Sequence, residues 1–147
     1  MRNLIARMFG VGSPLSPLER LVLGNIRERL SAPIQIVWDK QIAAINKVQR
    51  LPEGAEANFY RMKNGCPSFD GDIAFPNRST ELLIAKIHLE APNNISLVAD
   101  VWSVNGFIFS IEYGNKVDYF EEAVDMDPPL PFILNCALVA DLMADVS

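Results

Sequence analysis

Residues 81–113 read ELLIAKIHLEAPNNISLVADVWSVNGFIFSIEY. Three runs in this stretch are rich in the β-branched and aromatic residues that strands favour, and they cover residues 81–90, 95–104 and 107–113. A loop at 91–94 separates the first two runs, and Asn105-Gly106, the strongest short-range hairpin signal, separates the last two. The stretch therefore predicts a three-stranded antiparallel meander.

The two turns also predict which residues share a face of the meander. A two-residue turn at 105–106 places Trp102 opposite Phe109. A four-residue turn at 91–94 puts Asp100 on the same face, because directly paired residues lie on one side of a sheet. The other members of this apolar face are Leu83, Ala85, Ile87, Leu89, Val98, Phe107 and Ile111. Two interpretations follow: Asp100 lies among aromatic side chains, or a β-bulge moves Asp100 and Trp102 to the polar face.

Two helices are expected before the meander. Ser16 and Glu19 have the spacing of a capping box, and apolar residues then recur at helical spacing, so we predict a helix over 17–31. A second helix should begin at Pro33 and end before Leu51. Its apolar stripe consists of Ile34, Val37, Trp38, Ile42, Ile45 and Val48. The short connection between the two helices predicts a helical hairpin.

The remaining segments carry weaker signals. Residues 58–63 resemble a short strand, and a loop rich in Asp, Gly, Pro and Asn covers 64–80. Residues 117–122 fit either a fourth strand of the meander or the start of a helix. Residues 132–145 fit a helix and a strand equally well, and we predict a helix because the segment is longer than most strands.

The order of these elements predicts an α+β fold, in which an N-terminal helical hairpin packs on an antiparallel β-meander, with a C-terminal helix or an extra strand. We expect residues 1–147 to form a single globular domain and residues 1–15 to be an N-terminal tail or a docked loop. A chain of this length buries about 70% of its unfolded surface, which is enough for one core. The order contains no βαβ unit, so a Rossmann-type nucleotide site is not expected.

Composition narrows the classes of partner. The net charge is −5, which disfavours nucleic-acid binding because such proteins need a basic face. No apolar run approaches the roughly 18 residues that span a bilayer, so we expect no membrane segment. Cys66 and Cys136 form neither a disulfide framework nor a metal motif. We therefore expect a cytoplasmic protein with free thiols, no metal and no cofactor.

Charge is distributed unevenly along the chain. Residues 1–78 carry eleven Lys/Arg and seven Asp/Glu, a balance of +4, whereas residues 79–147 carry two and eleven, a balance of −9. Five carboxylates crowd into ten positions from Asp118 to Asp127, beside aromatic residues that could anchor a partner. The candidate partner-binding residues are Tyr119, Glu121, Glu122, Asp125 and Asp127. Such a surface would steer a basic protein toward it.

An alternative site is a ligand cleft between the 64–80 loop and the sheet. Its polar groups would be Asp70, Asp72, His88 and Glu112. His88 is the only histidine, and alternation places it on the polar face of its strand, so we predict no catalytic residue. Two aspartates around a glycine are typical of turns, whereas a calcium loop needs more oxygen ligands.

These observations favour a non-catalytic protein-binding or inhibitory module with an acidic surface for a basic protein. In composition alone, the chain resembles the immunity proteins that neutralise bacterial toxins, nucleases especially. A small enzyme or ligand-binding protein that uses the 64–80 cleft is the alternative, and a structural subunit of a larger assembly is a third interpretation.

Overall fold

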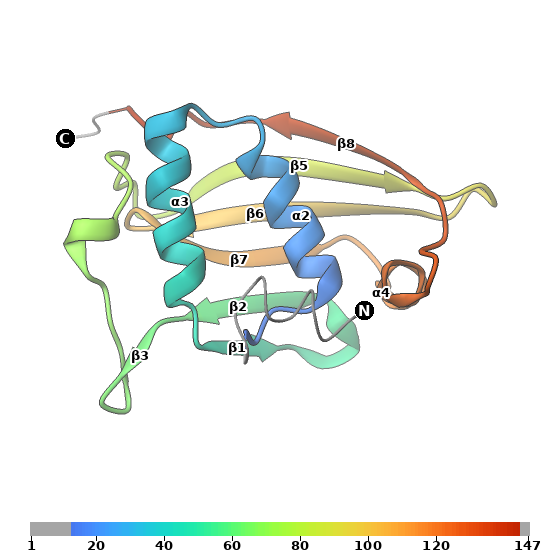
Figure 1. Ribbon diagram of the computed structural model, residues 1–147, viewed down its shortest axis with the longest axis horizontal. Coiled ribbons are helices and arrows are strands. Elements are labelled where there is room, and N and C mark those ends of the chain that lie inside the picture. Colours follow the sequence, from blue (N-terminus) through green and yellow to red (C-terminus); the bar gives the residue numbers. More distant parts are fainter. Residues whose placement is uncertain (1–12, 145–147) are drawn as a thin grey trace.

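The predicted meander forms the middle of a six-stranded antiparallel sheet (Figure 1). The computed structural model describes residues 13–144, so the predicted tail over 1–15 lies mostly outside the described residues. In spatial order the strands are β1 (Lys47–Arg50), β2 (Glu56–Tyr60), β7 (Phe107–Tyr113), β6 (Ser96–Val104), β5 (Leu82–Glu90) and β8 (Ile133–Leu138). A separate small hairpin consists of β3 (Met62–Lys63) and β4 (Cys66–Pro67).

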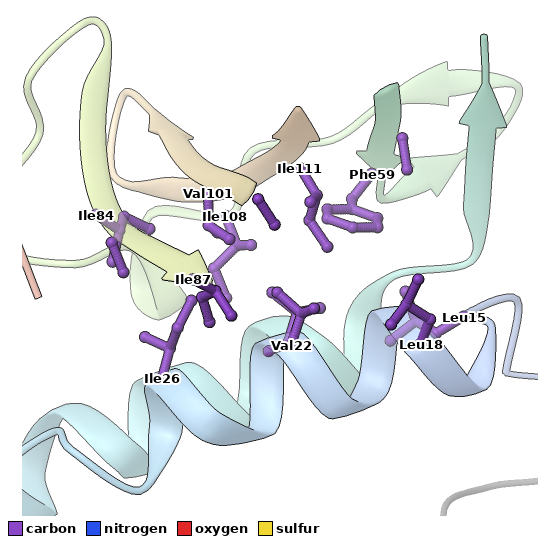
Figure 2. Close-up of a cluster of buried hydrophobic side chains, with 14 of the residues drawn as sticks. Leu15, Leu18, Val22, Ile26, Phe59, Ile84, Ile87, Val101, Ile108 and Ile111 are labelled. Atoms are coloured by element: carbon purple, nitrogen blue, oxygen red, sulfur yellow. The ribbon is translucent and has the colours of Figure 1, made fainter. Parts of the chain in front are cut away.

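Two helices, α2 (Pro17–Arg27) and α3 (Ala32–Ala44), cross one face of the sheet, and the short α4 (Asp118–Asp125) lies at one end (Figure 1). This arrangement confirms the predicted α+β class, with an N-terminal helical hairpin on an antiparallel sheet. Figure 2 shows Val22 and Ile26 of α2 pointing at the apolar side chains of the central strands, including Ile87. Helix-facing side chains of the sheet therefore form the core.

The capping box at the start of α2 is present. The Ser16 hydroxyl accepts a hydrogen bond from the Glu19 amide at 3.1 Å, and the Glu19 carboxylate accepts one from the Ser16 amide at 2.7 Å. Glu19 is buried and also binds Arg50 of β1 through two contacts of 2.8 and 3.0 Å. The cap thus joins α2 to an edge of the sheet. The helix ends at Arg27 rather than at residue 31, because the amides of Arg29 and Leu30 bond to carbonyls three residues back.

The second helix is shorter than predicted. It ends at Ala44, and residues 47–50 form β1 instead of continuing the helix. Asn46 explains the change of direction, because its side chain makes hydrogen bonds of 2.7 and 2.8 Å to the backbone of Met62 and so ties the chain to the start of β3, just after β2. Ile45 and Val48 still contact the core, which is why they fitted a helical stripe.

The helix predicted over 132–145 is wrong, and the strand alternative is correct. Residues 133–138 form β8, which pairs antiparallel with β5 and places Leu134 and Cys136 toward the core at a period of two. The open choice over 117–122 is also settled, since α4 begins at Asp118.

The register of the meander differs from the prediction in both strand pairs, at a bulge within β7 and at the loop after Glu90. Trp102 lies opposite Ser110 rather than Phe109, because Phe109 is the extra residue of a β-bulge. The loop after Glu90 is one residue longer than expected, so Glu90 pairs with Ser96. Together these shifts move Asp100 to the polar face, as the bulge interpretation proposed. The turn at Asn105-Gly106 forms as predicted, with φ values of 52° and 91° that favour this pair.

Candidate functional site

One face of the sheet carries α2 and α3, and within residues 13–144 no helix lies over the opposite face, which we call the open face. Strand alternation and register place a mixed set of side chains on it. They include Glu56, Asn58, Tyr60, Lys86, His88, Glu90, Val98, Asp100, Trp102, Phe109 and Glu112. Antiparallel sheets commonly expose one face to water, so the question is what this face can bind.

Three carboxylates form a line across the open face. The register pairs Glu56 with Glu112, Glu112 with Asp100, and Asp100 with Lys86, on four adjacent strands. We call the three acids the acidic row. Lys86 binds Asp100 at 3.1 Å and is the one cation paired with the row in the described chain. Partial burial and then the charge of Glu56 raise the pKa of Glu112, with smaller contributions from Asp100 and Glu81.

Aromatic side chains lie on the same face, from Trp102, two residues from Asp100, toward the Asn105-Gly106 turn. The rings of Tyr60 and Phe109 meet edge to face at 5.7 Å, and those of Phe69 and Phe107 do so at 5.5 Å. Phe69 is 61% exposed, which is high for a phenylalanine. The indole nitrogen of Trp102 is buried and has no hydrogen-bond partner among the described residues. We call Tyr60, Phe69, Trp102 and Phe109 the aromatic end of the open face.

Beneath the aromatic end is a buried arginine that sequence reasoning missed. Arg61 is 7% exposed and donates hydrogen bonds to the carbonyls of Gln41 (3.3 Å) and Ile108 (3.0 Å). No carboxylate of the described chain lies within ion-pair distance of it, and burial lowers the pKa of Arg61 to about 10. Its guanidinium also lies 5.7 Å from the centre of the Phe107 ring. Backbone carbonyls and an aromatic face therefore hold this cation.

A cavity does exist between the sheet and the segment that follows Arg61, but its volume is only about 10 Å³, room for roughly one water molecule. It is lined by Phe59, Tyr60, Arg61, Pro67, Ser68, Phe69, Val104, Phe107 and Phe109. None of the four polar residues of the predicted 64–80 cleft is among them. A second hollow, of about 360 Å³, is shallow and lies between the loop after β5 and the start of β8.

The structure distributes those four polar residues over two regions. The Asp70 carboxylate accepts a hydrogen bond from the Asp72 amide at 3.0 Å and so stabilises a single 3-10 turn, Gly71–Ile73, next to α3. His88 and Glu112 both lie on the open face, with β6 between their strands, and both are exposed. No hydrogen bond or ion pair joins any two of these four side chains.

The acidic segment that the charge distribution singled out is α4 and the residues after it. Phe120 and Ala123 anchor α4 in the core, and Tyr119 meets Phe120 edge to face at 5.3 Å. The exposed carboxylates here are Asp118, Glu121, Glu122, Asp125 and Asp127. Partial burial and then the charge of Asp118 raise the pKa of Glu121. The structure thus brings the predicted acids together on one small surface, which we call the α4 surface.

Comparison with known proteins identifies no relative: no family model matches the chain, and neither a curated protein nor a solved structure matches it. Over residues 13–144, no helix is long and apolar enough to cross a membrane. The same residues contain no group of three or more His, Cys, Asp or Glu side chains that could hold a metal ion. What the protein does must therefore be argued from its surfaces.

Proposed function

We propose that this chain is a non-catalytic protein-binding module that takes a basic protein on the open face of its sheet. The observation that carries the proposal is the acidic row, in which Glu56, Asp100 and Glu112 lie in register across neighbouring strands and share one paired lysine. Like charges directly opposite one another destabilise a sheet. A cationic side chain from a partner would offset this repulsion.

The aromatic end supplies surface for direct contact, which a pattern of charges alone does not. Aromatic side chains are enriched among the residues that dominate binding energy, and Phe69 is exposed and Phe109 half-exposed at the aromatic end of the same face. The buried Trp102 indole N–H is a donor that a small rearrangement would offer to a partner's carbonyl. Carboxylates would direct the approach of a basic partner, and the rings would hold it. The same carboxylates repel phosphate groups, so we propose no nucleic-acid partner.

The α4 surface is a second acidic patch on the same module. Tyr119, Glu121, Glu122, Asp125 and Asp127 could contact the partner directly or only attract it over distance. We favour attraction over distance, because the one aromatic side chain there is half-buried against Phe120. An inhibitor of a basic toxin, of the immunity-protein kind, would use both surfaces in this way. Two free cysteines, one of them exposed, fit a reducing cytoplasm.

The test begins with a pull-down from the native host, followed by mass spectrometry, with the purified chain as bait. Association rates of the recovered partner are then measured over a range of salt concentrations for three matched double substitutions. Each removes two negative charges: Glu56→Gln with Glu112→Gln on the open face, Glu122→Gln with Asp125→Asn on α4, and Asp70→Asn with Asp72→Asn at the 3-10 turn.

We expect the open-face pair to slow association, speed dissociation and flatten the salt dependence. The α4 pair should slow association and leave dissociation unchanged, because we expect these carboxylates to act only by long-range attraction. Salt at physiological concentration screens attraction beyond about 8 Å, whereas it does not remove direct contacts. The Asp70/Asp72 pair should change nothing. If the open-face pair binds like the unmodified protein, the open face is not the binding surface. If the Asp70/Asp72 pair is the one that loses binding, the loop cleft is the site.

A further inference from the structure

The two edges of the sheet differ in how they are protected. An edge strand presents unpaired backbone groups, and proteins commonly guard it with charges, proline or short length. β1 has only four residues, carries Lys47 and Arg50, and is followed by Pro52. β8 has six residues, and the stretch 132–139 contains neither a charge nor a proline. Within residues 13–144, β8 pairs with β5 alone, and Figure 1 shows its outer side uncovered.

The register identifies which backbone groups of β8 are free. The Val139 amide donates to the Ile84 carbonyl at 2.8 Å, so odd-numbered residues of this segment turn their N–H and C=O groups toward β5. The N–H and C=O groups of Leu134, Cys136 and Leu138 consequently point away from the sheet. Three consecutive outward positions can form a complete ladder with another strand.

Apart from Asn135, the side chains along this edge are apolar, and they are accessible on both faces of the sheet. Ile133 is 62% exposed and Val139 is 55% exposed on the open face. Leu138 is 40% exposed on the helix-bearing face, where Leu134 and Cys136 are partly buried. The strand itself carries no charge that would repel an identical strand, and the charge of Arg29 reaches Cys136 from outside the strand.

We propose that β8 pairs with β8 of a second copy of this chain, antiparallel and about a two-fold axis at Cys136, so that the two sheets become one. An antiparallel edge is complementary to itself across such an axis, and two-fold dimers are the commonest homo-oligomers. In this register Leu134 lies opposite Leu138 of the second copy, Ile133 opposite Val139, and Cys136 opposite Cys136. The exposed Ile133, Leu138 and Val139 each then gain a large apolar neighbour.

The alternative axis, at Asn135, is poorer. It would place two Asn135 side chains opposite each other and would leave Val139 opposite Pro131 rather than opposite a strand residue. The proposal does not depend on the proposed function, because β8 contributes nothing to the acidic row or the aromatic end.

Two double substitutions test the dimer and its register together. Residues 135 and 137 are exposed on the open face, and in the proposed register each Asn135 lies opposite Ala137 of the second copy, with Cα atoms about 4.5 Å apart. Asn135→Lys with Ala137→Lys places lysine against lysine twice. Asn135→Glu with Ala137→Lys places glutamate against lysine twice. Both variants share the same change at 137, next to Lys86 of their own chain.

Sedimentation velocity should show a dimer for the unmodified chain and for the Glu/Lys variant, and a monomer for the Lys/Lys variant. Circular dichroism confirms that all three are folded. A monomer of the unmodified chain at every concentration measured overturns the proposal, as does a Lys/Lys variant that dimerises as well as the unmodified chain. A Glu/Lys variant that is as monomeric as Lys/Lys overturns the axis at Cys136.

Cross-linking supplies an independent readout. In a hydrogen-bonded antiparallel pair the Cα atoms lie about 5.5 Å apart, inside the range of about 4.4–6.8 Å that a disulfide spans. Oxidation of the Cys66→Ser chain with copper phenanthroline should therefore yield a disulfide-linked dimer. The same treatment of the Cys136→Ser chain should yield far less, although Cys66 is exposed. Equal yields from the two chains would mean collision rather than a defined interface.

Discussion

Gln41 is buried at the centre of a polar network that joins α3 to the sheet, and its replacement by leucine should be severely destabilising. The Gln41 side-chain amide donates to the carbonyls of Ile73 (2.6 Å) and Gly106 (2.9 Å), and its oxygen accepts from the Ile108 amide (2.8 Å). Gly106 retains a second partner, the Phe75 amide at 2.8 Å. The Ile108 N–H and the Ile73 carbonyl would each lose the glutamine.

A buried polar group without a partner costs about 1–3 kcal/mol, so two such groups, one only partly buried, predict a loss of about 3 kcal/mol. That loss is a large fraction of the roughly 5–15 kcal/mol by which domains are stable. Glutamine and leucine have similar helix propensities, so the helix itself should contribute little to the difference. Equilibrium urea unfolding followed by tryptophan fluorescence measures it, since Trp38 stacks on Phe75 in the core.

The control is Lys40→Leu, at the neighbouring exposed position of the same helix. Surface substitutions of this kind usually change stability by less than about 0.5 kcal/mol. If Gln41→Leu unfolds at the same urea concentration as Lys40→Leu, the hydrogen bonds of Gln41 do not stabilise the junction, and the reasoning from unsatisfied groups fails.

Four further substitutions have distinct expected outcomes. Ser16→Ala removes the α2 cap and should lower the free energy of unfolding by about 1 kcal/mol, measured by urea unfolding. Trp38→Ala should cost about 3–5 kcal/mol, and Phe109→Ala clearly less because its ring is half-exposed on the open face; the reverse order would contradict the assignment of faces. Glu112→Gln should raise stability at pH 7 by roughly 0.2–1 kcal/mol, because it relieves repulsion in the acidic row. The pKa of Glu112 is higher in the folded state than in the unfolded chain. The repulsion is therefore present above the folded-state pKa and absent below the unfolded-state pKa. Thermal melts should show that the stability gained by Glu112→Gln vanishes near pH 4.

The central sheet could be predicted because its signals are local. Asn105-Gly106 and the loop after Glu90 join strands that are neighbours in the chain, and both turns lie where the sequence places them. The bulge at Phe109 follows from energetics that the turn signals do not contain. Without this bulge and the longer loop after Glu90, Asp100 would lie among apolar side chains, at a cost of several kcal/mol. The longer loop pairs Asp100 with Lys86, and the bulge pairs it with Glu112.

Predictions from local sequence failed where the spacing of the apolar residues fits both a helix and a strand. Ile45 and Val48 suit a helix by their spacing, yet α3 ends before Ile45 and Val48 lies in β1, where the bonds between Asn46 and Met62, distant in the sequence, redirect the chain. In the same way, residues 133–138 have no strong preference of their own, and the unpaired side of β5 determines that they form a strand.

The candidate site likewise has one part that could be predicted from the sequence and two parts that could not. The α4 surface was visible in the sequence because its carboxylates are adjacent in the chain. The acidic row was not, because Glu56 joins Glu112 only through the pairing of β2 with β7, and Asp100 joins them only once the bulge sets the register. Arg61 carried no sequence signal at all, since a single arginine after a strand is typical of an exposed edge.

The strand order β1-β2-β7-β6-β5-β8 also sets the sequence of events by which the chain folds. The contacts within β5, β6 and β7 close short loops, whereas β2 reaches β7 across the whole of residues 61–106, and β8 returns to β5 across residues 91–132. Short loops close at a lower entropic cost, so the meander should collapse first and act as a template for the distant strands. The chain therefore assembles from the middle outward, and amide hydrogens in β6 should exchange with solvent more slowly than those at either border of the sheet.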